Sequence, residues 1–384
     1  MKKLLALILA ISLIASLLVG CAGTTVVVGN CTCTAETTQA TNSDTPSTTT
    51  QATTAGTTAA TTTDAAQTTM PDASTDVAVK TGLSVSTNIS DSVSATADAA
   101  GAAKYDVTVA AVLVDDNGVI VSCVIDSIPA TVNFNAAGEI TADLAMSVPT
   151  KNEMGDSYGM VAWGGAIAEW DAQVAAVAEY AVGKTVDELK NGDIDMTTGK
   201  AKDGSDLSSS ATIYLAGYVY AIEAAVNNAQ HLGAKAGDEL VLATLNSVSG
   251  STSATAEKAG TAQLDADITA LTKADGKITS CYIDSLQAKV SFDTTGAITT
   301  DLSAAVQTKN ELGEAYGMVA WAGAIAEWDA QAASFAAYVT GKTAAEVAGI
   351  AITETTKPAD GSDLASSVTI AIGGFQALIA KAMQ

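Results

Sequence analysis

The sequence predicts an α+β protein made of two tandem copies of one unit, each a curved antiparallel sheet with packed helices, behind a leader and a Thr-rich tether. Residues 150–173 and 308–331 are identical at all but four of their 24 positions, at an offset of 158 (308 − 150). Self-similarity at a fixed spacing is typical of repeated structural units. In both halves, β-branched runs separated by short glycine turns precede this segment, as in antiparallel hairpins.

The domain boundaries follow from this repeat. Residues 77–232 form the first predicted domain and residues 233–384 the second. About 300 residues therefore follow the tether, which is enough for two domains with hydrophobic cores. His231 is the only histidine and lies at the junction, so we interpret it as a surface residue. A single histidine between two repeats argues against histidine catalysis or ligation in either domain.

The N-terminus has the pattern of an export signal, predicted as residues 1–20. Two lysines precede a short apolar run that ends at Gly20-Cys21. This pattern resembles a bacterial lipobox, which implies cleavage before Cys21 and lipid attachment to its thiol. The alternative is an ordinary signal peptide with an unmodified cysteine. Lipid on Cys21 would anchor the chain to the extracytoplasmic face of the bacterial cell membrane without spanning it.

Residues 21–76 are rich in threonine, alanine and serine and have few large apolar side chains. Such a composition buries too little apolar surface to offset chain entropy, so this stretch is predicted to be a disordered tether. Cys31 and Cys33 lie in it without further metal ligands nearby. They remain a candidate reactive or intermolecular thiol pair.

The charge of the chain limits its partners. Lysine and arginine together number 18, aspartate and glutamate 42, and the net charge is −24. All basic residues are lysines. Nucleic-acid binding is excluded because no basic surface is available to displace counterions. Bidentate arginine clamps on phosphate are absent too.

Each domain opens with predicted strands. In the first, residues 105–114 and 119–126 flank Asn117-Gly118, a strong hairpin signal, and residues 267–271 and 277–284 repeat the pattern. A further strand pair is predicted around residues 132–140 and again around 290–298. The turn at Asp115 lacks the spaced oxygen ligands of a calcium loop. Cys123 and Cys281 are predicted as buried core thiols, because a disulfide would require the domains to face each other through these strands.

A helix is predicted for residues 166–181 and its counterpart for 324–339, with Trp170 and Trp328 in the core. The residues just before each helix have two interpretations. Aromatic and thioether side chains in a glycine-flanked loop either cover a flat ligand ring or pack in the core. These residues are Tyr158, Met160, Trp163, Tyr316, Met318 and Trp321.

A third recurring element precedes the last helix of each domain. It reads Asp206-Leu207-Ser208-Ser209-Ser210-Ala211-Thr212 in the first and Asp363-Leu364-Ala365-Ser366-Ser367-Val368-Thr369 in the second. An aspartate and serines ahead of a helix are also explained by capping and turn chemistry alone.

The hairpin, the Tyr-Gly-Met segment with its helix, and the Asp-x-x-Ser-x-x-Thr motif together resemble the FMN-binding domain family. The closest likeness is to two-domain bacterial lipoproteins of extracellular electron transfer. In that family a flavin transferase joins FMN through its phosphate to the last threonine of the motif. The resemblance implies that Thr212 and Thr369 carry FMN. It also implies that Asp206, Ser209, Ser210, Asp363, Ser366 and Ser367 belong to the two cofactor sites.

The motif departs from the family pattern at three positions. At Ser210 and Ser367, serine replaces the glycine of the family motif, and at Val368 valine replaces its alanine. Glycine at that place would allow close backbone approach to a phosphate. The departures therefore bear on whether either domain accepts FMN.

Two functions follow from these observations. The first is a lipid-anchored electron carrier with covalent FMN, which takes electrons from a membrane donor and passes them to an extracellular acceptor. The second is a cell-surface binding or structural lipoprotein that uses the same fold without cofactor. A hydrolase is not favoured, because no Ser/His/Asp or Cys/His set repeats and no metal cluster is evident.

Overall fold

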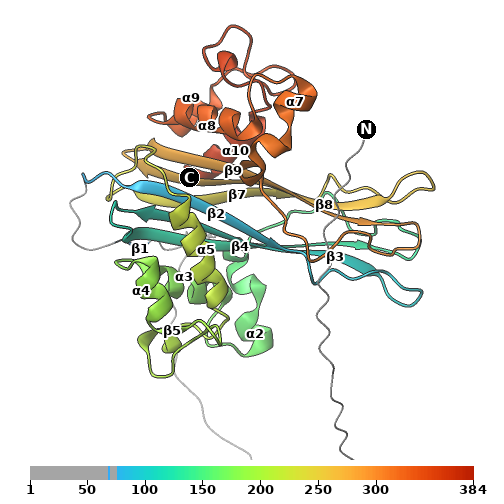
Figure 1. Ribbon diagram of the computed structural model, residues 1–384, viewed down its shortest axis with the longest axis horizontal. Helices are drawn as coiled ribbons and strands as arrows, with labels where there is room; N and C mark the ends of the chain where they lie inside the picture. Colours follow the sequence, from blue (N-terminus) through green and yellow to red (C-terminus); the bar gives the residue numbers. More distant parts are fainter. Residues whose placement is uncertain (1–67, 70–75) are drawn as a thin grey trace, which may run out of the picture. The chain divides into compact units, whose positions relative to one another are not determined.

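The computed structural model describes residues 68–69 and 76–384, which fall within one compact unit (Figure 1). The predicted leader, Cys21, Cys31, Cys33 and nearly all of the tether lie outside the described residues. The prediction of an α+β protein with antiparallel sheets is confirmed. The predicted domain boundary falls in the connection between α5 and β7, and the division into two domains stays a prediction.

The first half has one sheet of four strands in the order β1-β4-β3-β2, all antiparallel. Its strands are β1 (Thr68–Thr69), β2 (Lys80–Asn88), β3 (Gly101–Val114) and β4 (Ile120–Phe134). The segments that follow are α1 (Lys151–Met154), η1 (Gly155–Tyr158), α2 (Met160–Gly164), α3 (Trp170–Ala181), α4 (Val186–Asn191), the strand pair β5 (Ile194–Asp195) and β6 (Lys200–Ala201), η2 (Asp206–Ser209) and α5 (Ala216–Asn227).

The second half has a three-stranded antiparallel sheet in the order β7-β8-β9. Its strands are β7 (Glu239–Ser247), β8 (Gly260–Ala274) and β9 (Lys277–Phe292). The segments that follow are α6 (Lys309–Leu312), η3 (Gly313–Tyr316), α7 (Met318–Ala322), α8 (Trp328–Val339), α9 (Ala344–Ala348), η4 (Leu364–Ser366) and α10 (Gly373–Ala382).

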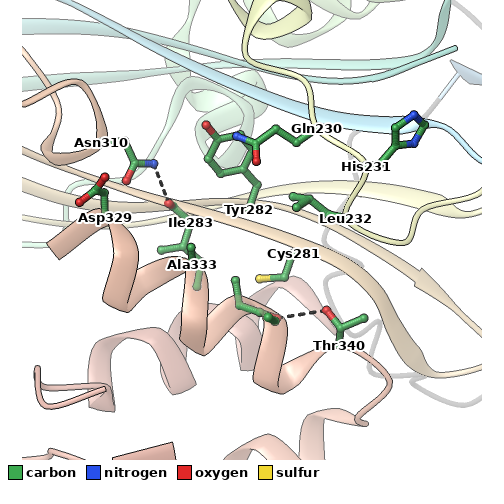
Figure 2. A pocket seen from close by; sticks show the side chains of 12 residues that line it. Gln230, His231, Leu232, Cys281, Tyr282, Ile283, Asn310, Asp329, Ala333 and Thr340 are labelled. Carbon is green, nitrogen blue, oxygen red and sulfur yellow. Dashed lines mark hydrogen bonds between the residues drawn. The ribbon is translucent and has the colours of Figure 1, made fainter. Parts of the chain in front are cut away.

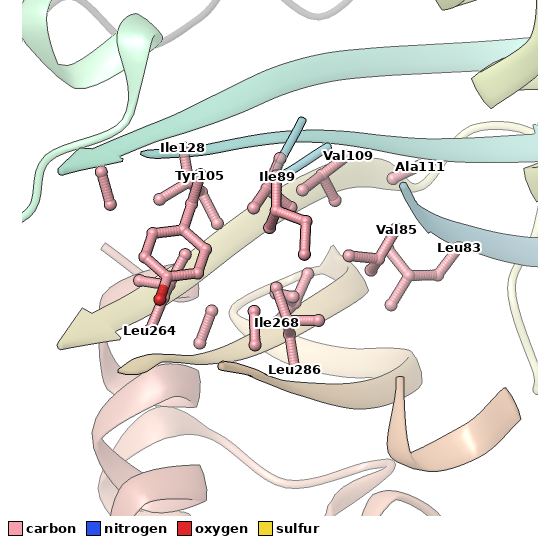
Figure 3. Packing of buried hydrophobic residues seen from close by; sticks show 14 of the residues in the cluster. Leu83, Val85, Ile89, Tyr105, Val109, Ala111, Ile128, Leu264, Ile268 and Leu286 are labelled. Atoms are coloured by element: carbon pink, nitrogen blue, oxygen red, sulfur yellow. The ribbon is translucent and has the colours of Figure 1, made fainter. Parts of the chain in front are cut away.

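The inner faces of the two sheets pack against each other and share one hydrophobic core (Figure 3). The rings of Phe134 and Phe292 stack in this core, with centroids 4.0 Å apart and planes 2° from parallel. The buried Tyr105 hydroxyl donates across the core to the carbonyl of Ala262 at 2.8 Å. Successive side chains of a strand point to opposite faces of its sheet. The face of each sheet that does not contact the other sheet therefore packs against the helices of its own half.

Helices cover the outer face of each sheet (Figure 1). Trp170 on α3 is buried in the helix-side core of the first half, and Trp328 on α8 in that of the second, as predicted. Cys123 and Cys281 belong to these two separate cores as free, buried thiols, which confirms their interpretation. Burial raises the pKa of both thiols to about 12, so they stay protonated.

The structure corrects two details of the predicted elements. The helix predicted from residue 166 begins at Trp170 because Glu169 is its N-cap. The predicted second strand pair is instead the continuation of β4, which meets Ile140 only through a single bridge from Phe134. In the second half, β9 likewise runs unbroken to Phe292.

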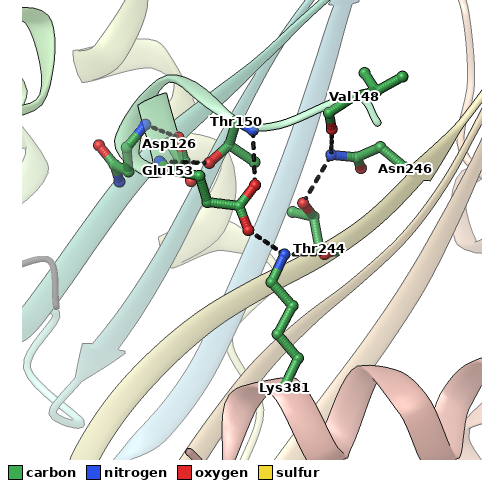
Figure 4. A network of polar contacts seen from close by, with 8 residues as sticks. Asp126, Val148, Thr150, Glu153, Thr244, Asn246 and Lys381 are labelled. Atoms are coloured by element: carbon green, nitrogen blue, oxygen red, sulfur yellow. Dashed lines mark hydrogen bonds and ion pairs between the residues drawn. The ribbon is translucent and has the colours of Figure 1, made fainter. Parts of the chain in front are cut away.

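Polar contacts also join the halves (Figure 4). Thr150 and Glu153 form a capping box at the start of α1. Lys381 on α10 pairs with the Glu153 carboxylate and donates to the carbonyl of Thr244 at 2.7 Å. The Asn246 amide donates to Val148 at 3.0 Å. The loop ahead of α1 is therefore held by both halves.

Candidate functional site

Thr212 lies on the loop between η2 and α5, at the protein surface. Its backbone N–H and its hydroxyl both donate to the side-chain oxygen of Gln173, at 2.8 and 3.2 Å. Gln173 is fully buried on α3, and its amide nitrogen donates to the carbonyl of Ala168 at 2.8 Å. That second bond fixes the orientation of the amide, so its oxygen must face Thr212. We call this pair the first threonine site.

The second half repeats this arrangement, which we call the second threonine site. The N–H and hydroxyl of Thr369 donate to Gln331 at 2.8 and 3.2 Å. Gln331 is also fully buried, and its amide donates to Ala326 at 2.7 Å. In both halves a buried glutamine orients a threonine, which is exposed at Thr212 and partly exposed at Thr369, and this is more than local turn chemistry requires.

The other motif residues bond within their own turns. Ser209 donates to the carbonyl of Asp206 at 2.7 Å, and Ser366 donates to that of Asp363 at the same distance. The two serines that replace the family's glycine adopt ordinary backbone, with φ of −113° at Ser210 and −122° at Ser367. No left-handed conformation is needed there, so serine causes no backbone strain. Val368, like Ala211, points into the helix-side core.

The Tyr-Gly-Met loop is positioned by an acid on the same helix as the glutamine. The Glu169 carboxylate accepts from the N–H groups of Met160 and Val161 at 2.7 and 2.9 Å. Glu169, the N-cap of α3, and Gln173 are about one turn apart, so the start of this helix holds both the loop and Thr212. Glu327 binds Met318 and Val319 in the same way, at 2.8 and 3.0 Å.

The six loop residues separate into two groups. Tyr158, Met160, Tyr316 and Met318 are partly buried against the helix-side cores. Trp163 is 90% exposed and Trp321 is 89% exposed. An indole so exposed leaves much apolar surface in water, so these two rings are available to cover a ligand.

A lysine with two aromatic rings accompanies each loop and was not predicted from the sequence. The Lys151 ammonium lies 5.3 Å from the Tyr158 ring centroid, 5.1 Å from that of Trp170 and 3.6 Å from the Asp106 carboxylate. Lys309 lies 5.5 Å from Tyr316 and 4.9 Å from Trp328. The signal was present, since Thr-Lys-Asn-Glu opens both copies of the repeated segment. These cation–π contacts hold the tyrosine of each loop in place.

A buried aspartate holds the start of the repeated segment, Thr-Lys-Asn-Glu, in each half. Asp126 accepts from the N–H groups of Ser127 and Asn152 at 2.7 and 3.1 Å, and Asp284 from those of Ser285 and Asn310 at the same distances. Burial raises the pKa of each carboxyl to about 6 despite these bonds.

Comparison with known proteins adds no assignment: no family model, no curated protein and no solved structure matches the chain. Within the described residues, no cluster of three histidine, cysteine or acidic side chains is placed to hold a metal ion. The helices of that same part of the chain include none long and apolar enough to cross a membrane. Inference about function therefore rests on the threonine sites and their surroundings.

Proposed function

We propose that the chain is a lipid-anchored extracytoplasmic flavoprotein that carries electrons through FMN joined by its phosphate to Thr212 and Thr369. Its two halves would be tandem flavin domains behind a leader ending at Gly20 and a tether. The observation that carries the proposal is a threonine, exposed at Thr212 and partly exposed at Thr369, that a buried glutamine holds with the same hydrogen bonds in both halves.

The surroundings suit a phosphate ester. The first residues of α5 and α10 follow the two threonines closely, and neither helix has a side-chain N-cap bond. An uncapped helix N-terminus favours negative charge. The exposed Trp163 and Trp321 provide apolar surface for a flat ring system. Bound FMN would supply the redox chemistry, and the protein would position and shield it.

Attachment needs a flavin transferase and a flavin nucleotide whose phosphate carries a leaving group. A bond forms between the threonine oxygen and phosphorus, the bond to the leaving group breaks, and the hydroxyl proton passes to a base. Once attached, the cofactor needs no arginine clamp. The chain's charge of −24 disfavours anionic electron acceptors, since like charges repel.

Threonine-to-alanine variants test the proposal, with the full chain co-produced with a flavin transferase. We expect about two FMN per chain for the unchanged protein, one for Thr212→Ala, one for Thr369→Ala and none for the double variant. Denaturing chromatography with absorbance and mass readout counts the covalent cofactor. Equal flavin content in all four proteins would contradict attachment at these residues. A cofactor-free chain would favour the binding or structural function.

Gln173 gives a second test, because Thr369 in the same molecule is the control. Gln173→Leu removes the acceptor that orients Thr212, and we expect FMN at Thr212 to fall at least tenfold relative to FMN at Thr369. Gln173→Glu keeps an acceptor oxygen and should retain more. Peptide mapping by mass spectrometry gives both occupancies. An unchanged ratio in Gln173→Leu would show that the glutamine has only a structural role.

A further inference from the structure

A pocket of about 510 Å³ lies beside β9 (Figure 2). Three elements enclose it: the connection that follows α5, strand β9, and helix α8 with the nearby Asn310. We call it the β9 groove. Its lining residues are Gln230, His231, Leu232, Cys281, Tyr282, Ile283, Asn310, Asp329, Ala333, Ala336, Ala337 and Thr340.

The corresponding place in the first half already holds a strand. Thr68 pairs with Cys123 and Thr69 with Ser122, so β1 adds to the outer edge of β4. Cys123 corresponds to Cys281 by the offset of 158. The residues that would correspond to β1 in the second half, 226 and 227 (68 + 158 and 69 + 158), belong to α5 and cannot reach this edge as a strand.

The backbone of β9 is oriented to accept a strand. The peptide groups of an antiparallel strand point alternately to its two edges. The carbonyl of Ile283 points outward, because it accepts from the Asn310 side chain at 2.9 Å. The backbone groups of Cys281, two residues earlier, therefore point outward as well. In the described part of the chain, no strand lies beyond β9 in its sheet. Ile278 bonds through its backbone to Gly341 and Lys342, and Phe292 forms a bridge to Ile298, so the open part of this edge lies around Cys281.

The lining of the groove specifies what it can bind. Ala333 and Ala337 are exposed on α8, so this wall of the groove presents short, uncharged side chains. One oxygen of Asp329 is buried and has no hydrogen-bond partner among the described residues. It needs an N–H or hydroxyl donor. Among the described residues that line the groove there is no lysine, and Asp329 is acidic, so an acidic segment would be repelled and an uncharged one would not.

We propose that the β9 groove binds the uncharged Thr-rich stretch 45–63 from a second copy of this chain as an added strand. This stretch contains only threonine, alanine, serine, glutamine, glycine and one proline. Threonine favours extended strands and supplies hydroxyl donors for Asp329. Strand addition at an open edge gains main-chain hydrogen bonds, and pockets for alternate side chains add selectivity. Strand β1, which consists of Thr68 and Thr69, gives the precedent, because two threonines of the same tether pair with β4 at the equivalent edge.

Co-purification of two differently tagged full-length copies, solubilised in mild detergent, tests this proposal. We expect the copies to co-purify. Ala333→Tyr fills the groove from an exposed helix position and should reduce co-purification at least tenfold. Ala330→Tyr, also exposed on α8 but outside the groove, should leave it unchanged. Excess synthetic peptide 45–63 should separate the copies.

Three outcomes would overturn the proposal. Copies that do not associate would rule out the second chain as occupant. Equal effects of Ala333→Tyr and Ala330→Tyr would place the contact elsewhere, for example in the apolar leader. Loss of association in Ala333→Tyr without competition by the peptide would show that another segment fills the groove. Circular dichroism of both variants, which change only exposed alanines, shows whether they fold.

Discussion

Phe134→Ala is expected to lower the free energy of unfolding by about 3–5 kcal/mol, which is the usual cost of removing a buried phenylalanine side chain. The ring is fully buried and stacks on Phe292 between the two sheets. Few neighbours can move into the space, because it lies between two hydrogen-bonded sheets. Chemical denaturation, monitored by tryptophan fluorescence, measures the change in the free energy of unfolding.

Phe292→Ala should cost a similar amount, and the double variant should cost less than the sum. Each substitution removes the same stacking contact, and the stability effects of substitutions at contacting residues are not additive. Trp163→Ala is the control, since its side chain is 90% exposed and its loss should change stability by at most about 0.5 kcal/mol. Two separate unfolding transitions, with only one shifted by Phe134→Ala, would contradict a single shared core.

Stability is expected to fall as pH rises through the range in which Asp126 and Asp284 ionise. Burial raises the pKa of both from 3.8 to about 6. The folded protein therefore holds these protons more tightly than the unfolded chain does, and the contribution is complete below about pH 4 and lost above about pH 6. A rise in pKa from 3.8 to about 6 corresponds to roughly 3 kcal/mol for each carboxyl.

Urea unfolding between pH 4.5 and 7.5 measures this dependence. Exposed carboxylates with lowered pKa, such as Asp116 and Asp293, contribute in the opposite direction. The comparison must therefore be with the double variant Asp126→Asn and Asp284→Asn, which keeps acceptor oxygens for the bonded N–H groups. The double variant should lose the fall in stability between pH 4.5 and 6. Parallel pH profiles for the two proteins would show that these carboxyls do not titrate in that range.

The sequence predicted those parts of the fold that local patterns determine. The glycine turns predicted the positions of the long hairpins. The helical spacing of apolar residues predicted that Trp170 and Trp328 are buried in the core. Strand β2 was not predicted, because Leu83 and Val85 are the only large apolar side chains in its sequence and their alternation with serine is short. Its burial comes from α5 on one side and the second sheet on the other. Packing of the sheets depends on contacts between distant residues such as Tyr105 and Ala262, for which no local signal exists.

The candidate site was predicted only in part for a similar reason. The motif located Thr212 and Thr369, but it did not reveal Gln173 and Gln331, which come from a helix 39 and 38 residues earlier. The repeated Trp-Asp-Ala-Gln at the start of α3 and α8 was the available signal. The exposure of Trp163, in contrast to that of Trp170, depends on Gly159 and Gly165, whose left-handed backbone isolates α2 as a single turn.

Covalent flavin attachment is tested most directly by the intact mass of the full chain, co-produced with a flavin transferase and analysed after denaturation. Covalent attachment predicts a mass increase of two FMN groups, yellow colour that survives denaturation, and modified peptides that contain Thr212 and Thr369. An unmodified mass, from a transferase shown to modify another substrate in the same cells, would contradict the account of these threonines as flavin attachment sites.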